Sequence, residues 1–356
     1  MTTQSPRRST NMPEPSPALF FETVNAYQRT AALKAAIELD LFTAIGEQHE
    51  TVHELAHRCN ASERGLRILC DYLTIIGFLA KEGERYALTT DSAIFLDRRS
   101  PVYLGDSIEF LLSSTLVEAF KDVKEVVRKG GTLMPDEGAL APEHPMWVRF
   151  ARAMGPLMAL PAKLLANIVG ERAGGQARVL DIAAGHGMFG LAFAERHPQT
   201  EVTALDWVNV LEVARQNARD AGVEDRFHTI AGSAFEADYG GDYDLVLLPN
   251  FLHHFDVPTC ESVLRRIHAA LADGGSVAIV EFIPDEDRIN PPIAASFGMM
   301  MLGTTPQGDV YTFSQFKEML EKTGFADPEL HDLPPTFFRA LVARKVKASG
   351  RPNEEN

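Results

Sequence analysis

One segment near the middle of the chain constrains the fold more than any other. Residues 177–190 read ARVLDIAAGHGMFG, an apolar run followed by an acid, a glycine-rich turn and residues that can begin a helix. Val179 and Ile182 suit a strand that is buried on both faces. Gly185 and Gly187 permit a positive φ or the close approach of a ligand to the backbone. The segment therefore predicts a strand, a tight turn and a helix that together bind a small ligand.

The same glycines fit two cofactors. Gly185, Gly187 and Gly190 match a dinucleotide-binding fingerprint, and Asp206 ends the next apolar run, nineteen residues after Gly187. A nicotinamide dinucleotide needs a helix N-terminus for its pyrophosphate. S-adenosylmethionine has no pyrophosphate. It needs an acid for its ribose hydroxyls, a role open to Asp206, and an anion near its sulfonium and ammonium groups, a role open to Asp181. Both cofactors remain open at this point.

Composition limits the classes of partner. The 356 residues are 45% hydrophobic and 23% charged, which predicts a soluble, globular chain of two or three domains. A net charge of -15 and a pI of about 5.2, without a basic face, argue against nucleic acid. Three scattered cysteines form neither a disulfide framework nor a zinc cluster, so the cytoplasm is the expected compartment. Without a signal-peptide pattern or an uninterrupted apolar run of about 18 residues, we expect no membrane partner.

Residues 18–100 are predicted to form an α-helical domain that ends in a hairpin. Apolar residues recur at helical spacing from Leu33 to Leu41, a further helix follows Ser62 as its candidate N-cap, and an alternating stretch turns at Gly83. Helix, helix and hairpin in this order indicate a winged helix. Its second helix carries too few basic and polar side chains to read a DNA groove. Packing between subunits is the better interpretation of so apolar a surface.

Two further folded segments follow this domain. Residues 101–170 keep a helical periodicity, interrupted by a loop rich in glycine and proline at 130–145, and are predicted to be a helical linker that lines the substrate site. From 171 to 348, apolar strands alternate with helices, which is the pattern of a doubly wound parallel sheet with helices on both faces. The polar segments 1–17 and 349–356 are predicted to be disordered tails.

Four motifs in sequence carry a resemblance to a known family. DIAAGHG around Gly185, the acid Asp206, AGSAFE around Ser233 and NFLHHFD around His253 occur in the order and spacing of class I S-adenosylmethionine-dependent methyltransferases. More narrowly, the chain resembles the small-molecule O-methyltransferases with an N-terminal winged-helix dimerisation domain, known from plant phenolic metabolism and bacterial natural-product pathways. The resemblance covers about residues 18–345. It implies a Rossmann-like doubly wound α/β methyltransferase domain, S-adenosylmethionine as cofactor and a homodimer.

The resemblance also implies a set of donor-binding residues. Ala183 of this chain stands where the family's loop has a glycine, which leaves slightly less room at the backbone. Asp206 matches the ribose-binding acid, and Trp207 is available to lie against adenine. Where the family has an Asp that meets the adenine amino group, Ser233 accepts a hydrogen bond but carries no charge. Asn250 either binds the amino-acid end of the donor or caps its loop. The matched motif positions are Asp181, Ala183, Gly185, Gly187, Asp206, Trp207, Ser233, Ala234 and Phe235.

The family's catalytic His-Asp-Trp segment is matched by residues 252–256. In that register His253 is the general base, while His254 replaces the family's Asp, so the two histidines could exchange roles. Glu281, at the end of the fifth strand, is the closest match to the family's supporting acid. A hydroxyl attacks a sulfonium methyl group well only as its proton leaves, which suits a histidine with an ordinary pKa of about 6.5. A metal bound by His253, His254 and Asp256 is disfavoured, because adjacent loop residues seldom point the same way.

An apolar pocket is expected around the acceptor. FARAM resembles the family's Phe-x-x-x-Met beside the donor, and residues 297–301 resemble its substrate wall. Walls of this kind align an acceptor for in-line attack and favour a flat, aromatic, hydroxylated small molecule. The candidate substrate-binding residues are Trp147, Phe150, Met154, Phe251, Phe297, Met300 and Met301.

Other functions remain as alternatives to methyl transfer onto oxygen. A C- or N-methyltransferase, or a relative that binds S-adenosylmethionine without methylating, would keep the fold and the cofactor. An NAD(P)-dependent oxidoreductase would keep the glycine fingerprint, and a ligand-sensing regulator would use the winged helix. The mid-chain position of the glycine loop disfavours the oxidoreductase, and the acidic balance of the chain disfavours the regulator.

Overall fold

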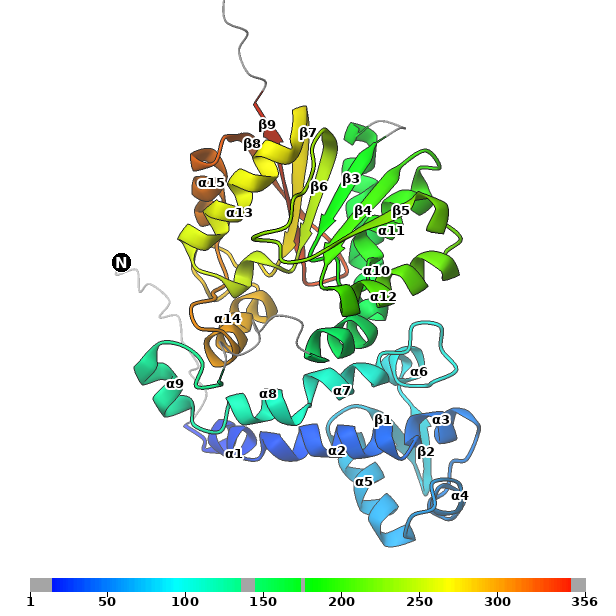
Figure 1. The fold of residues 1–356 in the computed structure, drawn as a ribbon. Coiled ribbons are helices and arrows are strands. Elements are labelled where there is room, and N and C mark those ends of the chain that lie inside the picture. The colour runs from blue at the N-terminus through cyan, green and yellow to red at the C-terminus, as the bar shows by residue number, and fades with distance from the viewer. Residues whose placement is uncertain (1–14, 136–144, 174–176, 347–356) are drawn as a thin grey trace, which may run out of the picture. The chain divides into compact units, whose positions relative to one another are not determined.

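The computed structural model describes residues 15–135, 145–173 and 177–346 of the chain (Figure 1). The predicted tails lie largely or wholly outside these residues, as do most of the predicted loop at 130–145 and residues 174–176, just after the end of the predicted linker. The chain divides into two compact units, and the division falls between Gly105 and Asp106. The helices predicted as a linker are therefore grouped with the sheet that follows them.

The N-terminal unit consists of short helices and a two-stranded hairpin. Ser62 is the N-cap of the helix Glu63–Ile75, since its Oγ accepts a hydrogen bond from the backbone N–H of Gly65 at 3.1 Å. Gly83 turns the hairpin with a φ of 59°. Both features match the predicted winged helix. The elements are α1 (Ala18–Val24), α2 (Ala26–Glu38), α3 (Leu41–Gly46), α4 (Val52–Arg58), α5 (Glu63–Ile75), β1 (Leu79–Glu82), β2 (Arg85–Leu88) and α6 (Thr90–Phe95).

The C-terminal unit begins with helices and continues as alternating strands and helices. The helices before the sheet are α7 (Ile108–Leu111), α8 (Ser114–Ala119), α9 (Val123–Lys129) and α10 (Pro145–Ala173). The strands are β3 (Arg178–Ile182), β4 (Glu201–Asp206), β5 (Phe227–Ala231), β6 (Tyr243–Pro249), β7 (Leu271–Glu281), β8 (Phe325–Asp332) and β9 (Arg339–Lys345). The helices between them are α11 (Met188–Arg196), α12 (Val208–Asp220), α13 (Val257–Ala270), α14 (Pro292–Thr304) and α15 (Phe313–Lys322).

The central sheet has seven strands in the order β5-β4-β3-β6-β7-β9-β8. Strands β3 to β7 are parallel, with Val179 opposite Val202 and Leu180 opposite Val246. β9 runs antiparallel to both β7 and β8. The prediction of a doubly wound sheet is confirmed, and the two late strands correct it from parallel to mostly parallel. The strand order reverses between β3 and β6, where ligands of open α/β sheets bind.

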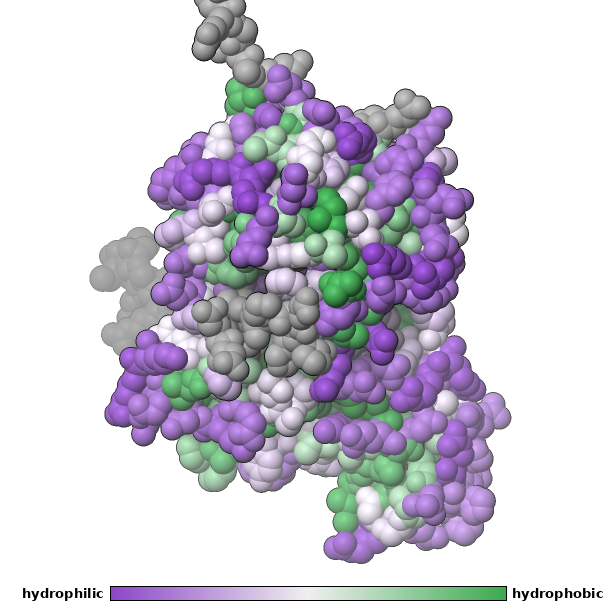
Figure 2. Space-filling view, in the orientation of Figure 1, coloured by the Kyte–Doolittle hydropathy of each residue, from purple (hydrophilic) through white to green (hydrophobic). Residues whose placement is uncertain are grey.

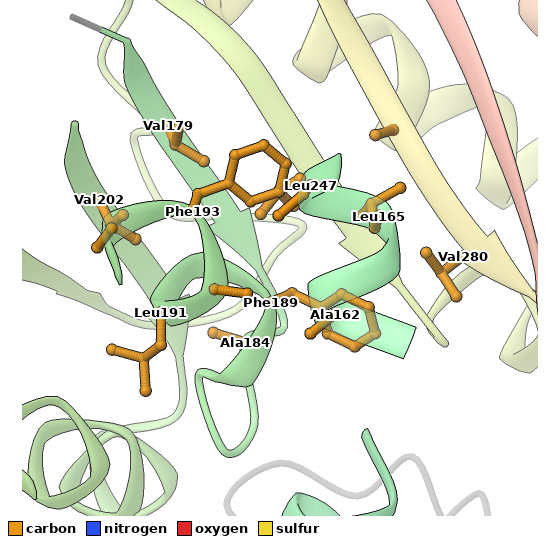
Figure 3. Packing of buried hydrophobic residues seen from close by; sticks show 14 of the residues in the cluster. Ala162, Leu165, Val179, Ala184, Phe189, Leu191, Phe193, Val202, Leu247 and Val280 are labelled. Carbon is orange, nitrogen blue, oxygen red and sulfur yellow. The ribbon is translucent and has the colours of Figure 1, made fainter. Parts of the chain in front are cut away.

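Alternate residues of the strands enter two cores, one on each face of the sheet. One core contains Leu165 of α10 and Phe193 of α11 against Val179 and Leu247 of the sheet (Figure 3). The other contains side chains of α13 and α15 against Leu180 and its neighbours on the opposite face. Helices thus cover both faces (Figure 1). Hydrophilic residues predominate on the outer surface of these helices that Figure 2 shows.

Helix α10 is long and apolar enough to cross a membrane, judged by length and composition. Its segment Met146–Gly170 has a mean hydropathy of 1.3, and 56% of that window is buried. Core helices pass the same test, and Leu165, Ala166 and Val169 belong to the core on one face of the sheet. α10 therefore has the packing of a core helix in this unit. It is the one such helix among the described residues.

Candidate active site

The glycine loop follows β3 and leads into α11. Ala183, Gly185 and Gly187 all have a positive φ, of 52°, 57° and 75°. A Cβ at Gly185 would meet nothing closer than the carbonyl oxygen of Ala183 at 3.9 Å, so the outer side of the turn is open. At Gly187 a Cβ would lie 3.1 Å from the Cβ of Ala214. The loop therefore needs glycine for its conformation at Gly185 and for both conformation and packing at Gly187.

Asp206 joins this loop to the end of β4. Its Oδ2 accepts a hydrogen bond from the backbone N–H of Gly185 at 2.8 Å, and its Oδ1 accepts one from Trp207 at 2.7 Å. Burial raises the pKa of Asp206 to about 6, against the lowering effect of these two bonds. Trp207 is partly buried and packs against Ala151 and Val210. The predicted ribose acid and glycine loop are thus in contact.

Asp181 lies within β3 and is fully buried. Its Oδ2 accepts a hydrogen bond from the backbone N–H of Gly190 at 2.9 Å, while its Oδ1 has no hydrogen-bond partner among the described residues. Burial raises the pKa of Asp181 to about 7. Gly190 brings α11 close to the sheet, because a Cβ there would lie 2.6 Å from Cγ1 of Val202. The last glycine of the fingerprint therefore serves helix packing.

Asn250 directly follows β6, which pairs with β3, and has a φ of 52°. Its backbone N–H donates to the carbonyl oxygen of Val280 at 2.7 Å. Its side-chain Nδ2 lies 3.5 Å from the thioether sulfur of Met158. Its Oδ1 is buried and has no hydrogen-bond partner among the described residues. Two buried acceptors, on Asp181 and Asn250, thus lack donors at the carboxyl ends of neighbouring strands.

The segment predicted to contact adenine follows β5. The backbone N–H of Gly232 donates to the carbonyl oxygen of Asp206 at 2.9 Å, which places the segment beside the end of β4. Oγ of Ser233 accepts a hydrogen bond from the N–H of Phe235 at 3.1 Å. Ala234 is buried, and the ring of Phe235 lies 6.0 Å from that of Phe251. This segment is therefore connected through Asp206 to the glycine loop and through Phe251 to the loop 250–256, which carries the two histidines.

His253 and Glu281 form a buried pair. His253 lies in the loop 250–256 after β6 and is 4% exposed, while Glu281 ends β7 and is 1% exposed. Nδ1 of His253 lies 2.5 Å from Oε2 of Glu281. Oε1 of Glu281 accepts bonds from the backbone N–H groups of Phe251 at 2.9 Å and His253 at 3.3 Å. One carboxylate thus orients both the imidazole and the backbone of its loop.

His254 points differently from its neighbour. Its ring centroid lies 4.3 Å from that of His253 and 5.6 Å from that of Trp147. Burial lowers the pKa of His254 well below its usual value, and the neighbouring His253 adds to this effect. Its Nδ1 is buried and has no partner in the described residues. Asp256 instead caps α13, accepting a bond from the N–H of Thr259 at 2.9 Å.

Aromatic and methionine side chains surround the histidine pair. Phe297 of α14 lies edge-on to His253, with ring centroids 5.0 Å apart, and stacks on Phe282 at 3.7 Å. Trp147 and Phe150 of α10 lie 5.8 Å apart in an edge-to-face contact. Of the predicted wall methionines, Met154 and Met301 are buried and Met300 is half-buried. Trp147 and Phe297 of the predicted wall thus lie beside the histidines. Met154 instead belongs to the core between α10 and the sheet, and Phe150 packs against that core.

Some residues at this site carried no clear signal in the sequence. His186, within the glycine loop, is buried, and its Nδ1 accepts a hydrogen bond from the backbone N–H of Met188 at 3.1 Å. Burial lowers the pKa of His186 to about 4, so the ring is neutral. Asn217 of α12 donates to its carbonyl oxygen at 2.8 Å. Tyr311 and Gly308, far along the chain, contact the histidine loop. Their roles depend on contacts that no local pattern indicates.

Comparisons with known proteins agree with this architecture. A family model described as an O-methyltransferase domain matches residues 157–326, and one described as an O-methyltransferase dimerisation domain matches residues 21–98. A crystal structure from Nostoc punctiforme, named as a candidate O-methyltransferase, is 58% identical, with a TM-score of 0.90 over 93% of this chain and 100% of that one.

More distant relatives extend the comparison. A 3-hydroxy-5-methyl-1-naphthoate 3-O-methyltransferase from Streptomyces sahachiroi is 28% identical over 87% of this chain and 90% of its own length. Human N-acetylserotonin methyltransferase, solved with S-adenosylmethionine, shares the fold with a TM-score of 0.80 at 21% identity, over 95% of this chain and 100% of that one. The chain therefore belongs to the S-adenosylmethionine-dependent O-methyltransferases that carry an N-terminal dimerisation domain.

Proposed function

We propose that this enzyme transfers a methyl group from S-adenosylmethionine to a hydroxyl of a small aromatic molecule, with His253 as the general base. The observation that carries the proposal is the 2.5 Å contact between Nδ1 of His253 and Oε2 of Glu281, buried at the carboxyl edge of the sheet. The cysteines of the chain are free thiols, which fits the cytoplasm as its compartment.

The pairing with Glu281 prepares His253 to accept a proton. Because a carboxylate only accepts hydrogen bonds, the proton of the neutral imidazole is assigned to Nδ1, which donates to Glu281. Nε2 is then left without a proton, as a base requires. Glu281 also stabilises the imidazolium that forms once the acceptor hydroxyl has given up its proton. His254 has a depressed pKa and lacks a carboxylate partner among the described residues, which favours His253 for this role.

The residues at the strand ends fit a cationic methyl donor. When bound, S-adenosylmethionine supplies an electrophilic methyl group on a sulfonium. Oδ1 of Asp181 and Oδ1 of Asn250 are buried acceptors without donors among the described residues, which suits the donor's ammonium group. Asp206 lies against the glycine loop, where a ribose would sit. An adenine would then lie beside the end of β4, near Trp207 and the segment of Ser233, Ala234 and Phe235. Gly185 leaves the backbone open to the ligand.

The acceptor would lie between rings that exclude water. Phe297 packs edge-on against the base, and Trp147 packs edge-on against His254. Phe150, Phe251, Met300 and Met301 complete the proposed wall, while Met154 supports it from the core behind α10. Aromatic faces favour a flat acceptor, and they hold its oxygen in line with the methyl group. The naphthoate and N-acetylserotonin named for the two relatives are acceptors of this class.

We propose that the enzyme acts as a homodimer assembled through the N-terminal unit. Within that unit, α1 has no buried residue, and Leu19, Phe20, Phe21 and Val24 are between 53% and 74% exposed. Such a patch needs a covering surface. Sedimentation of the full chain is expected to give a dimer, and Phe20→Asp is expected to weaken it. A wild-type monomer at micromolar concentration would contradict the proposal.

Titration calorimetry with a screen of acceptors tests the reaction. We expect the purified protein to bind S-adenosylmethionine and S-adenosylhomocysteine and not NAD or NADP. Radiolabelled methyl groups should then pass to hydroxylated aromatics in a panel containing 3-hydroxy-5-methyl-1-naphthoate, N-acetylserotonin and dihydroxynaphthalenes. Binding of the dinucleotides alone, or transfer to carbon or nitrogen, would contradict the proposal.

A further inference from the structure

We infer that residues 305–311, after α14, position the histidine loop for catalysis, with Gly308 and Tyr311 as its positioning residues. The histidine loop is defined as residues 250–256. The inference rests on the proposed role of His253 as the base. Both residues contact the backbone of that loop, and the role inferred for them is to act through it.

Gly308 lies directly against the backbone of the two histidines. A Cβ at this position would lie 2.4 Å from the carbonyl oxygen of His253 and 3.0 Å from the carbonyl carbon of His254. A Cβ here would also lie 2.5 Å from Oγ1 of Thr305. Cβ atoms essentially never approach a non-bonded heavy atom closer than 3.0 Å, so any side chain would force Gly308 and the His253 carbonyl apart by more than half an ångström. The glycine is therefore required for this close approach, independently of its φ.

Tyr311 holds the end of the same loop. Its hydroxyl donates to the carbonyl oxygen of Phe255 at 2.5 Å, and its side chain is 4% exposed. Burial raises the pKa of Tyr311, so the hydroxyl keeps the proton that it donates. Cys260 of α13 adds a thiol contact of 3.2 Å to the carbonyl oxygen of Leu252. Carbonyl groups along the loop are thus held by side chains from two elements, while Glu281 holds its N–H groups.

The segment 305–311 is itself fixed to the acceptor wall. Oγ1 of Thr305 donates to the carbonyl oxygen of Met301 at 2.7 Å and accepts from the N–H of Gly308 at 2.9 Å. The N–H of Thr132 donates to the carbonyl oxygen of Thr305 at 2.9 Å. Because α14 also carries Phe297, which contacts His253, the same segment ties the base to the wall that would orient the acceptor.

The expected effect is a loss of turnover without a loss of donor binding. Gly308→Ala displaces the base, and a misplacement of about 1 Å can cost about 10²-fold in rate, so we expect a fall in kcat of that order. Tyr311→Phe removes one buried hydrogen bond and should lower kcat about tenfold. The affinity for S-adenosylmethionine should remain that of the wild type, because Gly308 and Tyr311 contact the loop at residues 253–255 and not at Asn250.

Two matched controls separate positioning from general damage. Gly241→Ala adds the same methyl group where nothing lies within 4 Å. Tyr243→Phe removes a buried hydroxyl that donates to the carbonyl oxygen of Tyr239 at 2.9 Å, away from the histidine loop. Tyr243 is as buried as Tyr311, at 4% exposure. Both controls should keep wild-type turnover.

Proton NMR of the histidine side chains provides a readout that does not depend on the acceptor. The Nδ1 proton of His253, assigned by its loss in His253→Ala, should be strongly deshielded by Glu281. We expect it to move upfield in Gly308→Ala and, to a smaller extent, in Tyr311→Phe, and to stay in place in both controls. Turnover is measured on the same variants with the acceptor panel above, and donor binding by calorimetry.

The outcomes distinguish this inference from the proposed function. An unchanged His253 resonance and unchanged kcat in folded Gly308→Ala and Tyr311→Phe would overturn the inference, even if His253→Ala is inactive. If Gly308→Ala does not fold, Tyr311→Phe against Tyr243→Phe decides. Normal turnover of His253→Ala would instead overturn the base, whatever the positioning variants do.

Discussion

Replacing Asp181 by Asn should make the donor-free protein more stable and its donor binding weaker. The carboxyl group is fully buried and accepts one hydrogen bond, from Gly190, and its pKa is raised from 3.8 to about 7. Keeping it ionised therefore costs folding free energy, which a neutral amide of the same shape avoids. We expect Asp181→Asn to lose donor affinity at least tenfold, because it removes the anion proposed for the donor's cationic end.

The pH dependence gives the magnitude and its sign. The folded pKa lies above the unfolded one, so the native state binds more protons between the two values and stability falls as pH rises from about 4 to 7. At 1.36 kcal/mol per pKa unit, the raised pKa costs about 1.5 kcal/mol of folding free energy at pH 5, where the native carboxyl is protonated, and about 4 kcal/mol at pH 8, where it is ionised. The stability advantage of Asp181→Asn should therefore widen by about 2.5 kcal/mol over this range.

Urea unfolding followed by tryptophan fluorescence measures this difference in the relevant unit. The two tryptophans of the chain, Trp147 and Trp207, both lie after Gly105, so the signal reports the methyltransferase unit. Asp287→Asn is the control without a trend, since backbone N–H groups of its loop lower the pKa of this exposed acid, which is therefore ionised in the folded and the unfolded state throughout pH 5 to 8. A difference between wild type and Asp181→Asn that stays constant or narrows from pH 5 to pH 8 would refute the reasoning.

Three further outcomes are expected. Gly190→Ala should destabilise the methyltransferase unit by about 2 kcal/mol in urea, because its Cβ would overlap Val202, and an unchanged midpoint would contradict this packing. Calorimetry should show affinity for S-adenosylmethionine falling as pH drops below 7, since Asp181 and Asp206, with pKa values raised to about 7 and 6 by burial, become protonated; a flat profile would exclude them as donor ligands. Ala183→Gly should change the free energy of unfolding by less than about 1 kcal/mol, because relief of the positive φ offsets the greater freedom of the unfolded chain, and it should bind the donor normally; loss of binding would contradict this.

Local periodicity predicted most of the fold. Apolar runs indicated β3 to β7, and their alternation with helices gave the doubly wound class, which the structure confirms. The antiparallel direction of β9 could not be predicted. It depends on which strands β9 pairs with, namely β7 and β8, and the order of strands in a sheet leaves no pattern in the local sequence. The N-terminal domain was predicted to end at residue 100, close to the unit boundary at Gly105, but the grouping of the linker helices with the sheet was not predicted, since α10 looks like any apolar helix until it packs on the sheet.

The candidate site was predictable where motifs sit at strand ends. His253 and Glu281 were paired on family register, and the structure places them 2.5 Å apart, although their roles stay predictions. The open question between the histidines is narrowed by geometry, since Glu281 contacts His253. Gly308 could not be found in this way, because its significance is the space that a Cβ would take from a loop more than fifty residues earlier. Contacts of that kind exist only in the folded chain.

The most direct test of the account is turnover of His253→Ala beside His254→Ala, with donor binding measured by calorimetry on the same samples. The account predicts that His253→Ala loses about 10²-fold or more in kcat, as expected for loss of a general base, and binds S-adenosylmethionine as the wild type does. His254→Ala should retain far more activity. Normal turnover of His253→Ala, or a larger loss in His254→Ala, would contradict the assignment of His253 as the base.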